Sequence, residues 1–341
     1  MKSASKLVIT HVQYCLADHV STNAELQQEF PEWDMGRVEA KSGILERHVA
    51  AGGETALDLA KRACRDLLLR ASIEPHDVDG IVFCTQSPDH IMPSDAFLLH
   101  EFLELRHDTI AFDYNLACSG YIYGLAIVQG LIEIGLVRNV LLVTADTYSK
   151  YINKADRATR SLFSDAAAVS LISEARGGSS GVMDISLASS GKNHRSFYIP
   201  AGGCRLPRSD DTARESADEG GNVRSMNDIH MDGFAVWKFI ATEVPKQIAS
   251  VLARNNLTVD DIDLYVFHQA SKLTLDSLTK ALQIPCHKVY TNMASVGNCV
   301  SASIPIALAD AAIEGRLRRG QLVLLSGFGV GLSWGTLLMR Y

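Results

Sequence analysis

The two halves of this chain repeat one another, and the repeat limits the folds that the sequence can adopt. Residues 76–84 (HDVDGIVFC) correspond to residues 260–268 (DDIDLYVFH), with an offset of 268 − 84 = 184. A helix after Cys118 and a helix after Asn298 end in similar segments, with an offset of 315 − 135 = 180. This second offset places Asn298 opposite Cys118. The sequence therefore predicts an internal duplication of one strand-and-helix unit.

Strands alternate with helices along both halves, which predicts an α/β fold with parallel strands and helix-covered faces. We expect one half over residues 1–178 and the other over 179–341, with an exposed loop at 208–222. Apolar runs and helical periodicity predict strands at 7–12, 79–85, 110–113, 138–144, 166–172, 260–268 and 322–325, and helices at 22–43, 55–71, 94–105, 121–134 and 243–255.

Cys118 lies where a predicted strand is followed by a mostly apolar helix. Unpaired N–H groups and the helix dipole favour an anion at a helix N-terminus, so we expect this thiol to lose its proton more easily than usual. The small neighbours Ala117, Ser119 and Gly120 leave room for a substrate. On this stretch alone, a nucleophile and a buried structural cysteine are equally good interpretations.

His268 and Asn298 stand at equivalent corners of the second half, His268 after a strand and Asn298 before a helix. Taken singly, a core histidine and a helix N-cap are the simpler interpretations. Ligands of α/β sheets bind at the carboxyl ends of strands, and the duplication brings these corners together. The sequence therefore predicts one crevice that contains Cys118, His268 and Asn298.

Composition and charge exclude several classes of protein. The net charge of −7 argues against a general nucleic-acid binder, although local basic clusters could dock an acidic partner. We find no apolar run long enough for a signal peptide or a membrane span. The seven cysteines form no C-x-x-C pair, which indicates neither a disulfide framework nor a zinc site. We expect a reduced, cytoplasmic protein without a metal.

Four motifs follow one another along the chain: residues 115–121 around Cys118, 266–270 around His268, 297–305, which begin with Gly297-Asn298, and 327–335 (GFGVGLSWG). In this order they resemble the β-ketoacyl-acyl-carrier-protein synthase III family of the thiolase superfamily. The resemblance covers nearly the whole chain. It implies the thiolase fold, a duplicated five-layered α-β-α-β-α architecture.

The resemblance also implies a Cys-His-Asn triad of Cys118, His268 and Asn298. Cys118 would take an acyl group from an acyl-CoA. His268 and Asn298 would stabilise the enolate that forms when a malonyl thioester, on carrier protein or CoA, loses CO₂. The product would enter fatty-acid or related acyl or polyketide biosynthesis. CoA thioesters are substrates in this chemistry, and no cofactor is implied.

Further site residues follow from the resemblance alone. The backbone N–H groups of Cys118 and Val330 would form the oxyanion hole, with valine where the family usually has glycine. A homodimer is implied, in which one subunit closes the acyl pocket of the other. The remaining assignments are Trp33 and Arg157 for the CoA nucleotide, Ser271 for pantetheine, Met92 for closure of the partner's acyl pocket, and Lys238, Lys272 and Lys280 for docking of acidic carrier protein.

Two other functions fit the same fold. Some relatives transfer an acyl group to an oxygen or nitrogen nucleophile without decarboxylation, and departures at Ser271, Val330 and Met92 permit such a specialised pathway. Their third triad member is often acidic, so Asn298 favours decarboxylative condensation. A non-catalytic partner subunit is the other alternative, and the intact triad argues against it. The primer and the pathway stay open.

Overall fold

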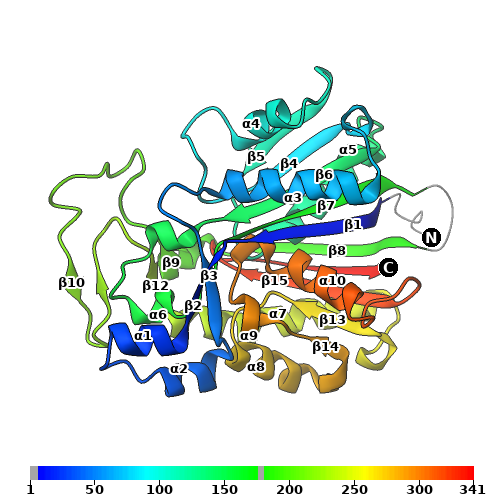
Figure 1. Ribbon diagram of the computed structural model, residues 1–341. Helices are drawn as coiled ribbons and strands as arrows, with labels where there is room; N and C mark the ends of the chain where they lie inside the picture. The colour runs from blue at the N-terminus through cyan, green and yellow to red at the C-terminus, as the bar shows by residue number, and fades with distance from the viewer. Residues whose placement is uncertain (1–6, 176–179) are drawn as a thin grey trace.

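The computed structural model describes residues 7–175 and 180–341, and two five-stranded sheets dominate it (Figure 1). The predicted boundary between the halves, at residues 178 and 179, lies outside the described residues. The first sheet has the order β1 (Leu7–Leu16), β7 (Ala166–Glu174), β6 (Asn139–Asp146), β4 (Gly80–Cys84) and β5 (Ile110–Tyr114). The second has the order β8 (Gly181–Ser189), β16 (Ser333–Arg340), β15 (Leu322–Gly329), β13 (Leu264–Phe267) and β14 (Val289–Tyr290). The matching orders confirm the duplication.

Helices form three layers around these sheets. Apolar side chains of α5 (Gly120–Glu133) and α10 (Ser303–Ile313) pack between the two sheets in one core. A second core lies between the first sheet and α3 (Ala56–Ala71) and α4 (Asp95–Phe102), and a third between the second sheet and α7 (Gly233–Arg254) and α8 (Lys272–Leu282). The predicted five-layered α-β-α-β-α thiolase fold is confirmed.

The sheets are mixed, so the prediction of parallel pairing is wrong for part of each one. β4 pairs in parallel with β5 and β6, whereas β7 is antiparallel to both β6 and β1. In the second sheet β16 is antiparallel to β15 and β8. Residues 330–332 join β15 to β16 directly, and only antiparallel strands can be joined by so short a connection.

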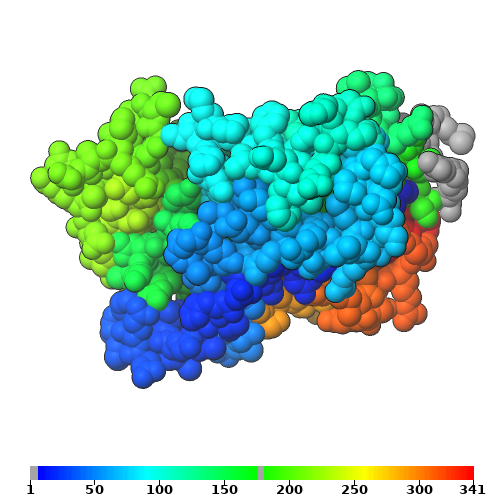
Figure 2. Space-filling view, turned by 45° about the horizontal axis from the view of Figure 1, so that its top comes forward, coloured from blue at the N-terminus to red at the C-terminus, as the bar shows by residue number. Residues whose placement is uncertain are grey.

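Most predicted elements are present, with shifted ends. The helix expected at 243–255 begins ten residues earlier, because the Asp232 side chain caps it by accepting from the N–H of Ala235 at 2.9 Å. The single helix expected at 22–43 is two short helices, α1 (Asn23–Glu29) and α2 (Met35–Ser42), with Pro31 in the break. The predicted loop at 208–222 contains β10 (Ser216–Ala217), labelled at the left of Figure 1, and the yellow-green region at the left of Figure 2 shows that this part of the chain projects.

No helix within residues 7–175 and 180–341 is long and apolar enough to cross a membrane. All seven cysteines are free thiols.

Candidate active site

Cys118 lies in the tight connection between β5 and α5. The N–H of Gly120 donates to the carbonyl of Ala117 at 2.7 Å, and Ser119 is the N-cap of α5. The Ser119 hydroxyl also contacts the hydroxyl of Ser333 at 2.7 Å, which ties this corner to β16 of the other half. The thiol is therefore held at the junction of the two halves, and Cys118 is only 4% exposed.

Burial dominates the acidity of this thiol. It raises the pKa of Cys118 to about 12, and the nearby Asp146 carboxylate acts in the same direction. The backbone N–H groups of Val330 and of Cys118 itself oppose the shift, because they hydrogen-bond to the sulfur. The expectation of a more acidic thiol is therefore wrong for the free protein. The N–H donors are present, but the loss of solvent outweighs them.

The end of β15 lies directly against Cys118. A Cβ atom at Gly329 would stand 2.7 Å from the Cys118 sulfur, and one at Gly327 would stand 2.7 Å from the Cys118 carbonyl oxygen. Only glycine fits at either position without displacing the thiol or its backbone. This close approach brings the N–H of Val330 to the sulfur. The valine at residue 330 packs against the apolar cluster that includes Cys118, Tyr148 and Phe197.

His268 follows β13, and its backbone N–H donates to the carbonyl of Ser326 at 2.9 Å. Burial lowers the pKa of the imidazole to about 3, so the ring is neutral at physiological pH. The ring makes a T-shaped contact with the Phe328 ring, with centroids 5.8 Å apart and an interplanar angle of 82°. Nδ1 is buried and has no hydrogen-bond partner among the described residues. A neutral imidazole of this kind can donate one N–H to a ligand.

Asn298 is fixed by segments from both halves. Its N–H donates to the carbonyl of Leu162, and its carbonyl accepts from the N–H of Ser164, both at 2.9 Å. The side-chain oxygen accepts from the N–H of Val300 at 3.0 Å. Since Oδ1 is occupied in this way, the amide presents its NH₂ group as a donor. Val300 takes φ = 49° to make this contact, an uncommon conformation for a β-branched residue.

Cys118, His268 and Asn298 line one cavity of about 170 Å³. Its remaining wall is mostly apolar, with Phe163, Phe197, Ile240 and Phe328. The cavity therefore brings together one thiol and two neutral donors in a site of low polarity. Among residues 7–175 and 180–341, no group of three His, Cys, Asp or Glu side chains is arranged to hold a metal.

A larger, outer cavity of about 790 Å³ adjoins this one, and the two share Trp237 on α7, Leu273 on α8 and Ser271, the N-cap of α8. Three cations, Arg37, Lys41 and Arg157, line the outer cavity. The sequence analysis identified Arg157 but missed the other two. Their signal was the i, i+4 spacing of basic residues, which puts both on one face of a helix.

Of the other two residues predicted to contact CoA, Ser271 lies at the cavities and Trp33 does not. Ser271 lines both cavities, but its side chain also caps α8 by accepting from the N–H of Thr274 at 3.3 Å. Trp33 is 4% exposed and stacks on Phe30, with centroids 4.2 Å apart. Trp33 lines none of the cavities described here, and its stacking on an adenine stays a prediction.

Met92 and the three lysines lie at the surface. Met92 is 80% exposed and lines none of the cavities described here. Lys238 is on α7, and Lys272 and Lys280 are on α8, all exposed and on the helices that border the outer cavity. Lys272 pairs with Asp276.

A third cavity, of about 360 Å³, is lined by Val330, Phe197 and Tyr148 among others. Tyr148 and Phe197 form an aromatic cluster with Phe163 of the inner cavity, with ring centroids 5.3 to 6.4 Å apart. The Tyr148 hydroxyl donates to Gln86 at 2.6 Å. Phe197 lines both this cavity and the one that contains Cys118, so the two cavities adjoin at that ring.

Comparison with known proteins agrees with this geometry. A family model described as 3-Oxoacyl-[acyl-carrier-protein (ACP)] synthase III matches residues 112–191, and the model of its C-terminal region matches residues 252–341. A β-ketoacyl-[acyl-carrier-protein] synthase III of Symbiobacterium thermophilum is 37% identical over 98% of this chain and 97% of its own. A crystal structure of a 3-oxoacyl-(acyl-carrier-protein) synthase III superposes with a TM-score of 0.96 at 39% identity, covering 98% of this chain and 100% of that one. A second crystal structure, of a 3-oxoacyl-(acyl carrier protein) synthase III from Pseudomonas aeruginosa PAO1, has a TM-score of 0.85 at 32% identity, with 98% of both chains covered.

The raised pKa of Cys118 predicts how its alkylation depends on pH. The thiolate is the reactive form, so labelling by iodoacetamide should accelerate about tenfold per pH unit from pH 7 to 10 without a plateau. Mass spectrometry of peptides measures this, with the exposed Cys204 and Cys286 as internal controls. A plateau of the Cys118 rate near pH 8 would contradict the effect of burial described here.

Proposed function

Because this chain belongs to the 3-oxoacyl-[acyl-carrier-protein] synthase III family, we propose that Cys118, His268 and Asn298 carry out its condensation reaction. The chain is an acyltransferase of the type that initiates fatty-acid biosynthesis. The observation that carries the assignment of residues is the single cavity lined by one thiol and two neutral donors.

In the first step, the Cys118 sulfur attacks the carbonyl carbon of an acyl-CoA. The N–H groups of Cys118 and Val330 hold the oxyanion that forms, as their contact with the sulfur supports. The carbon–sulfur bond to CoA breaks, and the proton lost by Cys118 ends on the CoA sulfur. No net proton is consumed, so a thiol with a high pKa in the free protein is compatible with this exchange.

In the second step, a malonyl thioester replaces CoA. His268 and Asn298 donate hydrogen bonds to its thioester oxygen, and loss of CO₂ leaves an enolate that these donors stabilise. The enolate carbon attacks the acyl carbon on Cys118, the carbon–sulfur bond to Cys118 breaks, and the thiolate takes up one proton from solvent. The products are CO₂ and a β-ketoacyl thioester. The free NH₂ of Asn298 and the neutral ring of His268 support these roles.

The outer cavity admits the substrates. Arg37, Lys41 and Arg157 face the phosphates of CoA, while Ser271 lies where pantetheine passes between the two cavities. Lys238, Lys272 and Lys280 dock an acidic carrier protein that brings the malonyl group, although malonyl-CoA would use the same path. A cytoplasmic location is part of the same proposal.

The acyl group extends past Phe197 into the third cavity, and a second copy of the chain closes it in a homodimer. The exposed apolar pair Ile91 and Met92, 97% and 80% exposed, supports this arrangement, because such side chains are usually covered by a partner. The alternatives of a non-decarboxylating acyltransferase and a silent subunit lack support, since Asn298 is an amide and Cys118 is present.

The acylation of Cys118 tests the first step. Incubation with an acyl-CoA should add one acyl mass to the intact protein, and the adduct should disappear in Cys118→Ala. Cys84→Ala is a matched control, because Cys84 is also a buried thiol near this corner. An adduct mapped to Cys84 or Cys299 would overturn the assignment.

Asn298→Asp tests the second step more sharply than Asn298→Ala. Aspartate can still accept from the N–H of Val300, but it has no NH₂ to donate. Asn298→Asp and His268→Ala should each slow malonyl decarboxylation on the order of 10²–10³-fold, with a smaller effect on acylation of Cys118. Single-turnover measurement of the two steps checks this. Loss of acylation with retained decarboxylation would show that the division of roles is wrong.

Met92 is expected to influence the length of the acyl primer. Methionine is flexible and easily displaced, so we expect hexanoyl- and octanoyl-CoA to be used at least as well as acetyl-CoA. Met92→Phe should shorten the accepted range and Met92→Ala should widen it, since each buried CH₂ contributes about 0.8 kcal/mol. The kcat/KM values for the three substrates measure the profile, with Ile91→Ala as the neighbouring control. An unchanged profile in both Met92 variants would remove Met92 from the pocket.

A further inference from the structure

A hairpin beyond the catalytic triad packs against the segment that carries Arg157. It consists of β10 and β11 (Val223–Arg224), joined by a turn at residues 218–222, and it lies in the projecting region at the left of Figure 1. The N–H of Val223 donates to the carbonyl of Ala155 at 3.2 Å. The hairpin therefore contacts the segment that immediately precedes α6 (Arg157–Arg160).

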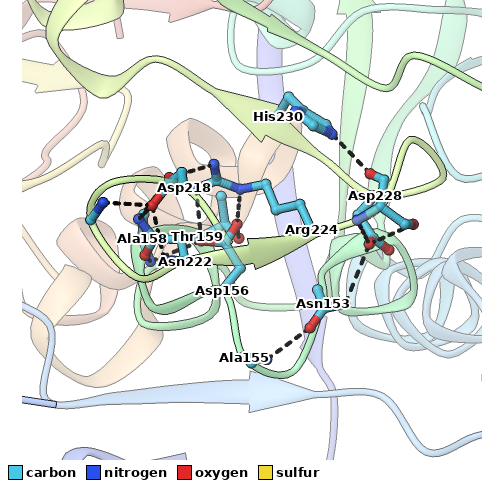
Figure 3. A network of polar contacts seen from close by, with 12 residues as sticks. Asn153, Ala155, Asp156, Ala158, Thr159, Asp218, Asn222, Arg224, Asp228 and His230 are labelled. Atoms are coloured by element: carbon cyan, nitrogen blue, oxygen red, sulfur yellow. Dashed lines mark hydrogen bonds and ion pairs between the residues drawn. The ribbon is translucent and has the colours of Figure 1, made fainter. Parts of the chain in front are cut away.

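Arg224 is the centre of this contact (Figure 3). Its Nε and one terminal nitrogen donate to the two carboxylate oxygens of Asp156 at 2.7 and 2.9 Å. Its other terminal nitrogen donates to Asp218, in the turn of the hairpin, at 3.0 Å. The Arg224 side chain is 12% exposed and that of Asp156 only 1%. A bidentate pair with so little solvent has a fixed geometry and is costly to break.

Further hydrogen bonds fix the backbone next to Arg157 and the end of its side chain. Asp156, the preceding residue, also accepts from the hydroxyl of Thr159 at 2.6 Å and from the N–H of Ala158 at 3.1 Å. That N–H of Ala158 also donates to the side chain of Asn222 in the hairpin, at 3.1 Å. The guanidinium of Arg157 itself donates to the carbonyl of Gly220 at 3.3 Å. The hairpin thus holds both the backbone around Arg157 and the end of its side chain.

We propose that Arg224 is a positioning residue for the nucleotide end of CoA, which acts by fixing Arg157 at the outer cavity. This inference rests on the proposed contact between Arg157 and CoA. Arg157 lines the outer cavity, whereas Arg224 does not. An arginine side chain has many rotamers, so holding it in place before binding reduces the entropy lost when it contacts a phosphate.

This arrangement favours acyl groups that arrive on CoA over those on a shorter thiol. A thioester of pantetheine lacks the nucleotide and cannot gain from Arg157. Discrimination between the two donors is therefore a property of the Asp156–Arg224–Asp218 network, in addition to the cations that line the cavity.

The test compares the same acyl group on CoA and on pantetheine, by kcat and KM for acylation of Cys118. Arg224→Gln, which keeps much of the side-chain length but loses the charge, should raise KM for acyl-CoA about tenfold more than for acyl-pantetheine. The expected effect lies in KM rather than kcat. Arg224→Lys should restore part of the discrimination, because it returns the charge without the bidentate contact.

Arg214→Gln is the matched control. Arg214 lies in the same region and pairs with Asp211, but both side chains are about 80% exposed. This variant should leave kcat and KM unchanged for both acyl-CoA and acyl-pantetheine. In a double variant with Arg157→Ala, Arg224→Gln should add no further loss for acyl-CoA, since its effect passes through Arg157.

The outcomes separate this inference from the proposed function. If Arg157→Ala does not reduce the discrimination, the role of Arg157 itself fails. If Arg157→Ala reduces it but Arg224→Gln does not, or if Arg224→Gln affects both donors equally, then Arg224 has only a structural role. Additive losses in the double variant would also overturn the inference.

Discussion

The apolar layer that α5 and α10 form between the two sheets is the constraint on which the rest of the structure depends. Side chains of both helices pack in one core with strands of both halves. The segments that precede these helices carry Cys118 and Asn298, so packing of the helices fixes where the thiol and the amide meet. The contacts of Ser119 with Ser333, and of Asn298 with residues 162–164, then cross between the halves at the same place. The site is thus a consequence of how the duplicated core closes.

The burial that holds this core together also determines the chemistry. Removing solvent raises the pKa of Cys118 and lowers that of His268, so both are neutral before a substrate binds. Burial likewise raises the pKa of Asp146 to about 7, which partly neutralises a carboxylate that would oppose a thiolate. A neutral site of low polarity strengthens each hydrogen bond to charge that develops during the reaction. Donors fixed by backbone contacts, such as the amide of Asn298, need no rearrangement at that moment.

The sequence was sufficient to predict the features that occur in both halves of the fold. The duplication predicted the two sheets and the corners that carry Cys118, His268 and Asn298, because equivalent elements occupy equivalent places. It could not predict the acidity of Cys118, which depends on burial by β15 from the other half. It also could not show that Trp33 stacks on Phe30, since a tryptophan near a binding region has the same pattern whether it is covered or open. Arg37 and Lys41 were missed because surface helices commonly carry such pairs.

The inner site and the outer cavity are held by different kinds of contact, and this difference has a consequence for specificity. Around Cys118 and Asn298 the constraints are backbone hydrogen bonds and close approach at Gly327 and Gly329, where almost any substitution disturbs the reaction centre. Around Arg157 the constraints include the ion pairs of Arg224 with Asp156 and Asp218, which join this segment to a hairpin in the projecting region of Figure 1. Side chains there can change without moving the sheets or the central helices. With Arg157 in its proposed role at CoA, preference for the carrier of the acyl group could vary through this region while the residues around Cys118 stay the same.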